Sequence, residues 1–125
     1  MKGLSETIRV RSVLGRFLEH SRIFVFETPD RTAYFMGSAD LMPRNLDHRI
    51  EIVAPIENPR AQTELNAILD QLLADNSTAW ELRQDGSWER LKPHKGERPT
   101  STQAALMRRA QIRARRQAEY RSRAR

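Results

Sequence analysis

The strongest pattern in the chain is the run Asn58-Pro59-Arg60-Ala61-Gln62-Thr63-Glu64-Leu65-Asn66-Ala67-Ile68-Leu69-Asp70-Gln71-Leu72-Leu73. From Leu65 onward, its large apolar residues follow the i, i+3, i+4, i+7, i+8 spacing of a single helix face. Asparagine is favoured just before a helix, and proline is favoured at the first helical position. The run therefore predicts an amphipathic helix that begins after Asn58 and buries one face against a core.

Three strand patterns precede this helix. Residues 21–27 and 32–36 are rich in β-forming apolar side chains, and the turn residues 28–31 separate them, which predicts a hairpin. Residues 49–56 alternate apolar and polar side chains and predict a third strand.

A second hairpin is predicted beyond the helix. Residues 80–82 and 88–91 flank the dipeptide Asp85-Gly86, which is a strong signal for a tight hairpin turn. Near the start of the chain, the apolar residues of 10–20 lie at helical spacing, so a short amphipathic helix is expected there. Together these elements predict an α/β fold with a mixed sheet and flanking helices.

Composition limits the class of protein. A chain of 125 residues fits one domain of ordinary size. It has no cysteine, which excludes a disulfide scaffold, a thiolate metal site and a thiol nucleophile, and leaves the cytosol as the default compartment. The longest strictly apolar runs have four residues, as in 23–26 and 33–36, so the sequence predicts neither a membrane span nor a signal peptide.

The formal net charge of +6 is unevenly distributed. Residues 98–125 hold nine arginines and one glutamate, whereas residues 1–97 hold thirteen basic and fifteen acidic residues. We predict a linker over 93–100 and an Arg-rich tail over 101–125 that is a frayed helix or disordered. Two interpretations of the tail stay open: a clamp for nucleic acid or another polyanion, and a solubilising extension.

Polar residues gather at the ends of the predicted strands. His20 and Arg22 open the first strand, Ser38 follows the second, Asn45 lies on the loop after it, and Arg49 opens the third. A histidine among arginines suits phosphoryl chemistry, because Arg binds phosphate oxygens bidentately and His serves as acid, base or nucleophile. The alternative is that Arg22 and Arg49 only form surface ion pairs, with partners among the three acidic residues Glu19, Asp47 and Glu51.

Two longer runs carry a family resemblance. They are Gly15-Arg16-Phe17-Leu18-Glu19-His20-Ser21-Arg22-Ile23 and Gly37-Ser38-Ala39-Asp40-Leu41-Met42-Pro43-Arg44-Asn45-Leu46-Asp47-His48-Arg49-Ile50-Glu51. Both closely resemble the C-terminal domain of bacterial polyphosphate kinase. The family usually has Ser-Ser-Ala-Asp-Trp-Met where this chain has Gly37 to Met42, so Gly37 and Leu41 depart from its pattern. The similarity extends to the predicted hairpin ending at Lys92, which gives a domain over 1–92 and leaves 93–125 outside.

The catalytic half of that family consists of two phospholipase-D-like domains, and this chain resembles the second. The superfamily signature is His-x-Lys-x₄-Asp followed by Gly-Ser-x-Asn. Here His20-x-Arg22-x₄-Glu27 and Gly37-Ser38-x-Asp40 preserve the layout and charge types, with Asp in place of Asn. The resemblance therefore implies a phospholipase-D-like fold.

The resemblance also implies a function. The family reversibly transfers the terminal phosphate of ATP to inorganic polyphosphate, with Mg²⁺, through a phosphohistidine on the other phospholipase-D-like domain. His20 would be the second active-site histidine, which contacts the transferring phosphate. Arg49 is the next candidate for binding ATP or phosphate, followed by Ser38 and Asn45, whereas His48 is interpreted as structural. No metal ligand is expected in this chain, and nucleic acid is not an expected partner.

By the same resemblance, the sequence starts inside the family's final domain. The phosphorylated histidine, the Mg²⁺ ligands and the upstream ATP-binding residues would belong to the remaining domains, which are expected partners. We therefore expect a fragment, a split-gene product or a truncated copy without kinase turnover by itself. The expected location is cytoplasmic, with the parent enzyme free or peripheral to the inner membrane face. The alternative function is a stand-alone phosphate- or polyanion-binding module without catalysis.

Overall fold

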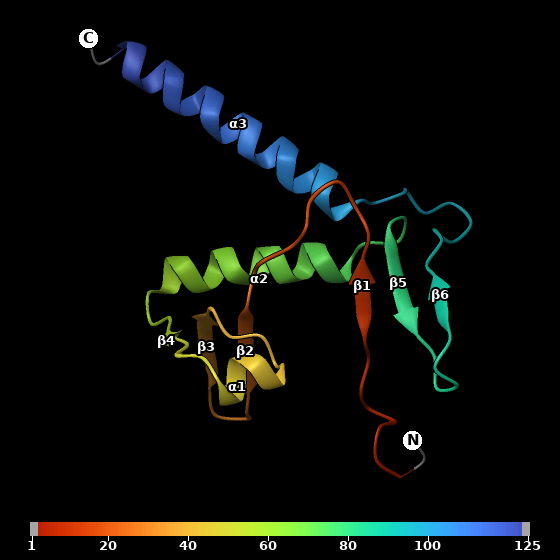
Figure 1. Ribbon diagram of the computed structural model, residues 1–125. Helices are drawn as coiled ribbons and strands as arrows, with labels where there is room; N and C mark the ends of the chain where they lie inside the picture. Colours follow the sequence, from red (N-terminus) through yellow and green to blue (C-terminus); the bar gives the residue numbers. More distant parts are fainter. Residues whose placement is uncertain (1–2, 124–125) are drawn as a thin grey trace. The chain divides into compact units, whose positions relative to one another are not determined.

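The computed structural model describes residues 3–123. They form two compact units, each with a three-stranded antiparallel sheet (Figure 1). The central unit comprises Leu18–Leu69, and the terminal unit combines the segment through Phe17 with the chain from Asp70 onward. Helices accompany both sheets, which confirms the predicted α/β class, but the described strands form two antiparallel sheets in place of the predicted mixed sheet.

The sheet of the central unit contains the first predicted hairpin. Strands β2 (Ile23–Glu27) and β3 (Thr32–Gly37) pair along their whole length, and β4 (Val53–Pro55) adds to the other edge of β3. The turn between β2 and β3 closes through the Thr28 N–H, which donates to the Arg31 carbonyl at 2.9 Å. The third strand is shorter than the predicted 49–56, because residues 49–52, which follow the short helix α1 (Pro43–Asp47), form a loop.

Helix α2 (Pro59–Leu73) begins where the sequence predicted. The Asn58 side-chain oxygen accepts the backbone N–H groups of Arg60 at 2.9 Å and Ala61 at 3.3 Å, which satisfies two donors of the first turn. Leu65 is buried on the apolar face of α2. The predicted helix and its cap are therefore confirmed.

The terminal unit has a sheet in the order β1-β5-β6, formed by β1 (Arg11–Val13), β5 (Ala79–Leu82) and β6 (Trp88–Arg90). The β5–β6 hairpin confirms the second predicted hairpin, and Gly86 in its turn has φ +86°. The predicted helix over 10–20 is wrong. Its first residues instead pair with β5, with Val13 opposite Ala79, and residues 14–20 have no regular structure.

Helix α3 (Thr102–Arg123) is anchored at its first residues. Thr102 is fully buried, and its hydroxyl donates to the Gln71 carbonyl at 2.8 Å. The Gln103 side chain bonds both backbone groups of Phe17, at 3.0 and 2.8 Å. From Arg108 to Arg123, every residue of α3 is exposed. The proposed division into 1–92, 93–100 and 101–125 stays a prediction.

Gly37 closes β3 at a position without room for a side chain. A Cβ atom there would lie 2.5 Å from the Ile52 carbonyl oxygen and 2.9 Å from Val53 Cγ2. We expect Gly37→Ala to destabilise the central unit by about 1–3 kcal/mol, because the neighbouring backbone must shift. Faster amide hydrogen exchange in β3 and β4 would show this effect. Unchanged exchange across both strands would contradict it.

Candidate functional site

Three segments of the central unit meet at one end of the β2–β3 pair. The Gly37 N–H donates to the Arg22 carbonyl at 3.0 Å, so the exit of β3 lies beside the entry of β2. The Ser38 N–H donates to the Ile52 carbonyl, also at 3.0 Å. These bonds bring together, at one end of the sheet, the residues before β2, after β3 and before β4, as the sequence predicted.

Arg22 and Asp40 form a bidentate ion pair across these segments. Arg22 Nε lies 2.8 Å from Asp40 Oδ1, and Nη2 lies 3.1 Å from Oδ2. The hydrogen bonds from Arg22 hold the pKa of Asp40 below its ordinary value, and Asp40 raises the pKa of Arg22 in return. Arg22 Nη1 also donates to the His20 carbonyl at 2.5 Å. Neither Glu19 nor Asp47, two of the partners considered for Arg22, takes part in this pair.

This ion pair links the two parts of the phospholipase-D-like signature. Arg22 occupies the position of the signature lysine, and Asp40 occupies that of the asparagine in Gly-Ser-x-Asn. Sequence reasoning identified both positions, but the partners it considered for Arg22 did not include Asp40. Their opposite charges within one signature were the signal that could have predicted the pair.

Glu51 forms a second cluster with three of the four candidate site residues. Its carboxylate accepts hydrogen bonds from the Ser38 hydroxyl and, at 2.8 Å, from Asn45 Nδ2. The hydrogen bond from Ser38 lowers the pKa of Glu51 most, and the bond from Asn45 adds to this effect. Arg49 Nε lies 3.5 Å from Glu51 Oε1, so the surface ion pair considered for Arg49 does form. Sequence reasoning had treated Glu51 only as a surface partner and missed its central place.

The four candidate residues differ in exposure. Asn45 is buried, with 4% of its surface accessible, and its amide is engaged by Glu51. The Arg49 side chain is 61% exposed, and His20 is exposed as well. A solute could therefore reach Arg49 and His20 directly, whereas Asn45 is held inside the cluster.

His20 lies beside the Arg22–Asp40 pair. The Arg22 hydrogen bonds lower the pKa of Asp40 most strongly, and the nearby charges of Arg44 and His20 add to this effect. The charge of Asp40 works against the lowering of the Glu51 pKa, while Arg22 attracts both carboxylates. The two clusters thus form one charged region of the central unit, with exposed histidine and arginine side chains and carboxylates that hold the arginines in place.

Residues 3–123 contain neither a candidate membrane span nor a candidate metal-ligand cluster. No helix there is both long and apolar enough to cross a membrane. Across the same residues, no three His, Asp or Glu side chains gather as metal ligands.

Comparisons with known proteins agree on one family. The family model described as polyphosphate kinase C-terminal domain 2 matches residues 1–103, past Lys92, where the resemblance was expected to end. Over 105 residues, the chain is 50% identical to a polyphosphate kinase of Thermosynechococcus vestitus, covering 84% of this chain and 14% of that one. It is 48% identical over 107 residues to a polyphosphate kinase of Mycolicibacterium gilvum, with coverages of 86% and 14%. The chain thus spans about one seventh of the length of these relatives.

A solved structure matches the fold as well. The crystal structure of polyphosphate kinase from Porphyromonas gingivalis superposes with a TM-score of 0.77 and 34% identity, over 86% of this chain and 16% of that one. The mixed α/β architecture, with its two antiparallel sheets and helices, is the phospholipase-D-like fold that the resemblance implied. The chain belongs to the family of the C-terminal domain 2 of polyphosphate kinase.

Proposed function

We propose that this chain supplies the second histidine-bearing half of a polyphosphate kinase active site. The whole enzyme would reversibly transfer the terminal phosphate of ATP to inorganic polyphosphate, with a phosphohistidine in the part upstream of this domain. The observation that carries the proposal is the bidentate Arg22–Asp40 pair, which joins the two parts of the family's signature beside an exposed histidine. A cytoplasmic location, where ATP is available, belongs to the same proposal.

His20 acts on the transferring phosphate as a general acid or base. Its imidazole is exposed next to a carboxylate that stays ionised because Arg22 lowers its pKa. When protonated, the imidazole can both donate a hydrogen bond to a phosphoryl oxygen and neutralise its charge. Arg22 is a positioning residue, since its guanidinium is divided between Asp40 and the His20 carbonyl.

Arg49 binds phosphate oxygens in this proposal. The Arg49 side chain is 61% exposed and its Nε lies 3.5 Å from Glu51, so this long ion pair contributes little and the guanidinium can exchange Glu51 for a phosphate at low cost. Phosphoryl transfer depends mainly on positioning and charge neutralisation, which is what an exposed arginine offers. Ser38 is a further candidate through its hydroxyl. Asn45 stays a predicted phosphate ligand, and its buried bond to Glu51 supports the cluster from within.

Mg²⁺ is assigned to the part upstream of this domain. Within residues 3–123, no group of three His, Asp or Glu side chains fits a metal ion. The two site carboxylates are engaged by arginine, serine and asparagine donors. A bound Mg²⁺ would neutralise charge on the nucleotide phosphates, and this chain would contribute the histidine and arginine described above.

A chimeric enzyme tests the proposal. Residues 1–103 of this chain would replace the matching region of the Thermosynechococcus vestitus polyphosphate kinase. We expect ATP-dependent polyphosphate synthesis within about tenfold of the parent enzyme's rate, because most of the binding energy and the phosphohistidine come from the retained part. The parent enzyme and a version lacking the region are the controls. The isolated chain is expected to show no turnover.

The same experiment distinguishes the alternative function, a stand-alone binding module, from the kinase assignment. A stand-alone phosphate-binding module would leave the chimera as inactive as the deleted version, although it folds and binds phosphate. A folded chimera without synthesis would therefore overturn the kinase assignment.

A further inference from the structure

Helix α3 carries a concentrated positive charge. It contains seven arginines, one glutamate and no lysine. From Arg108 onward, all of its side chains are exposed. Only the first two residues of α3 lie within the family match, so the charged part of the helix has no role inherited from the family.

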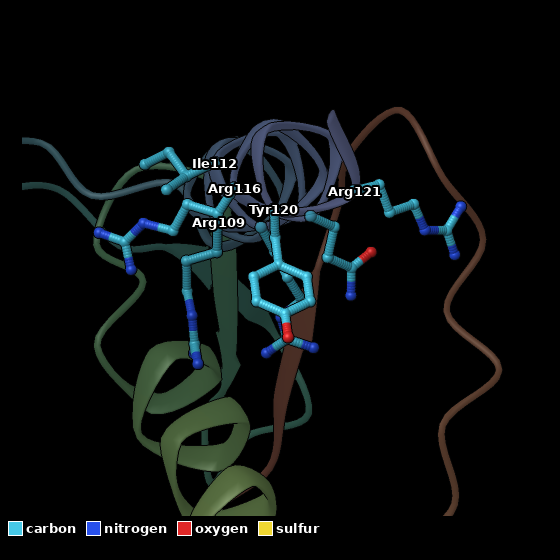
Figure 2. A pocket seen from close by; sticks show the side chains of 7 residues that line it. Arg109, Ile112, Arg116, Tyr120 and Arg121 are labelled. Carbon is cyan, nitrogen blue, oxygen red and sulfur yellow. The ribbon is translucent and has the colours of Figure 1, made fainter. Parts of the chain in front are cut away.

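The arginines are not evenly spread around α3. Arg109, Arg113, Arg116 and Tyr120 follow the 4, 3, 4 spacing that places residues on one helix face, and Arg121, about 120° around the helix from Arg109, lines the same hollow. We call these five residues the arginine strip. With Ile112 and Gln117 they line a shallow hollow along the helix. Figure 2 shows Arg109 and Tyr120 extending from the same side of α3, with Arg116 and Arg121 to either side of them.

Three further arginines of α3, Arg108, Arg115 and Arg123, are not part of the strip. Arg108 and Arg115 are about 100° or more around the helix from Arg109, given about 100° per residue. They carry the same charge on the same exposed helix, so they provide a matched comparison for the strip residues.

The strip fits a phosphate-bearing chain. Guanidinium groups bind phosphate oxygens through paired, charge-assisted hydrogen bonds, and a row of them binds a row of phosphates with release of counterions. Arg109 to Arg121 spans about 18 Å along the helix, so a linear polyanion can contact several arginines at once.

Two other polyanionic partners fit less well. A membrane-surface helix needs an apolar face, but beyond Met107 the only large apolar side chains of α3 are Ile112 and Tyr120. Single-stranded nucleic acid is held by successive aromatic stacking platforms, and Tyr120 is the one aromatic residue of α3. A linear phosphate polymer without bases needs only the arginines.

We propose that the arginine strip binds inorganic polyphosphate lying along α3. The choice of polyphosphate among phosphate polymers rests on the proposed function, whereas the anion-binding chemistry rests on the strip itself. In the assembled enzyme, the strip would hold a stretch of the polymer outside the catalytic residues and so retain long chains better than short ones.

Binding of the full chain to end-labelled polyphosphate, followed by fluorescence anisotropy at several salt concentrations, tests the proposal. We expect Arg113→Gln/Arg116→Gln to weaken binding by about five- to tenfold. The number of counterions released on binding, taken from the salt dependence of the affinity, should fall by about one to two. Arg108→Gln/Arg115→Gln removes equal charge and is expected to weaken binding by no more than about twofold. Helix content, measured by circular dichroism, should be equal in both variants because glutamine is a good helix former.

Three results would overturn the inference. One is an absence of binding at physiological salt, and another is equal weakening by the two double variants, since binding would then follow net charge alone. The third is displacement by single-stranded DNA as effective as that by unlabelled polyphosphate at equal phosphate concentration, which would favour nucleic acid. The chimera contains residues 1–103 only, so its activity is independent of the strip and the two proposals can fail separately.

Discussion

Replacing His20 with alanine in the chimeric enzyme is expected to lower polyphosphate synthesis by about 10²- to 10⁴-fold, which is the range that a general acid or base contributes. The loss should appear in kcat, because the imidazole acts on the phosphate during transfer and contributes little to holding ATP in the ground state. His20→Gln should be nearly as slow, since an amide can donate a hydrogen bond but cannot exchange a proton at neutral pH. Initial rates with saturating ATP measure both effects.

His48→Ala provides the matched control. His48 is an exposed histidine of the same unit, next to Arg49 in sequence, and the resemblance marks it as structural. We expect its loss to change the rate by less than about threefold, within the range of ordinary surface substitutions. Synthesis by the His20→Ala chimera within threefold of the unsubstituted chimera would remove His20 from the catalytic machinery.

Local patterns predicted the elements whose signals lie within a few neighbouring residues. The cap and apolar face of α2 depend on residues at most eight positions apart, and both hairpins depend on turn residues between two β-forming runs. In each case the interactions that stabilise the element are close in sequence. Composition and spacing could therefore predict them without knowledge of the fold.

Long-range partners were the part that local patterns could not supply. The 10–20 segment has apolar residues at helical spacing, but it lies against distant groups that override this preference. Val13 pairs with Ala79, and a side chain on Gly15 would collide with the amide of Gln103. The candidate site shows the same limit, because the sequence suggested Ser38, Asn45 and Arg49 but not that they share Glu51.

Asp75 is the clearest feature that sequence reasoning missed. It follows α2 and is buried, with 1% of its surface accessible. One carboxylate oxygen accepts the N–H groups of Ser77, Thr78 and Ala79, and the other accepts the Thr78 hydroxyl and the Thr102 N–H, all at 2.6–3.0 Å. A single carboxylate thus joins the end of α2, the start of β5 and the first turn of α3.

Asp75→Ala is expected to destabilise the terminal unit by about 3–5 kcal/mol. It leaves the N–H groups of Ala79 and Thr102 without their acceptor, and each buried, unsatisfied donor costs about 1–3 kcal/mol. Asp75→Asn should cost less, because its oxygen can still accept the β5 donors, while its NH₂ group would face the Thr102 N–H. Urea unfolding followed by tryptophan fluorescence measures this, since both tryptophans, Trp80 and Trp88, belong to the terminal unit.

The pH dependence of unfolding distinguishes the stabilisation by the charge of Asp75 from that by the shape of its side chain. Burial alone would raise its pKa, but the hydrogen bonds outweigh burial and lower the pKa from 3.8 to about 2. A folded-state pKa below the unfolded-state value adds about 2 kcal/mol of stability at pH values above the unfolded-state pKa, and this stability is lost as the pH falls from about 4 through 2. The difference in free energy of unfolding between the unsubstituted chain and Asp75→Asn should therefore become smaller over that pH range. Asp70→Asn, at an exposed position of α2, should differ little from the unsubstituted chain in free energy of unfolding. If the difference for Asp75→Asn does not change with pH, the shape of the Asp75 side chain and not its charge stabilises the protein.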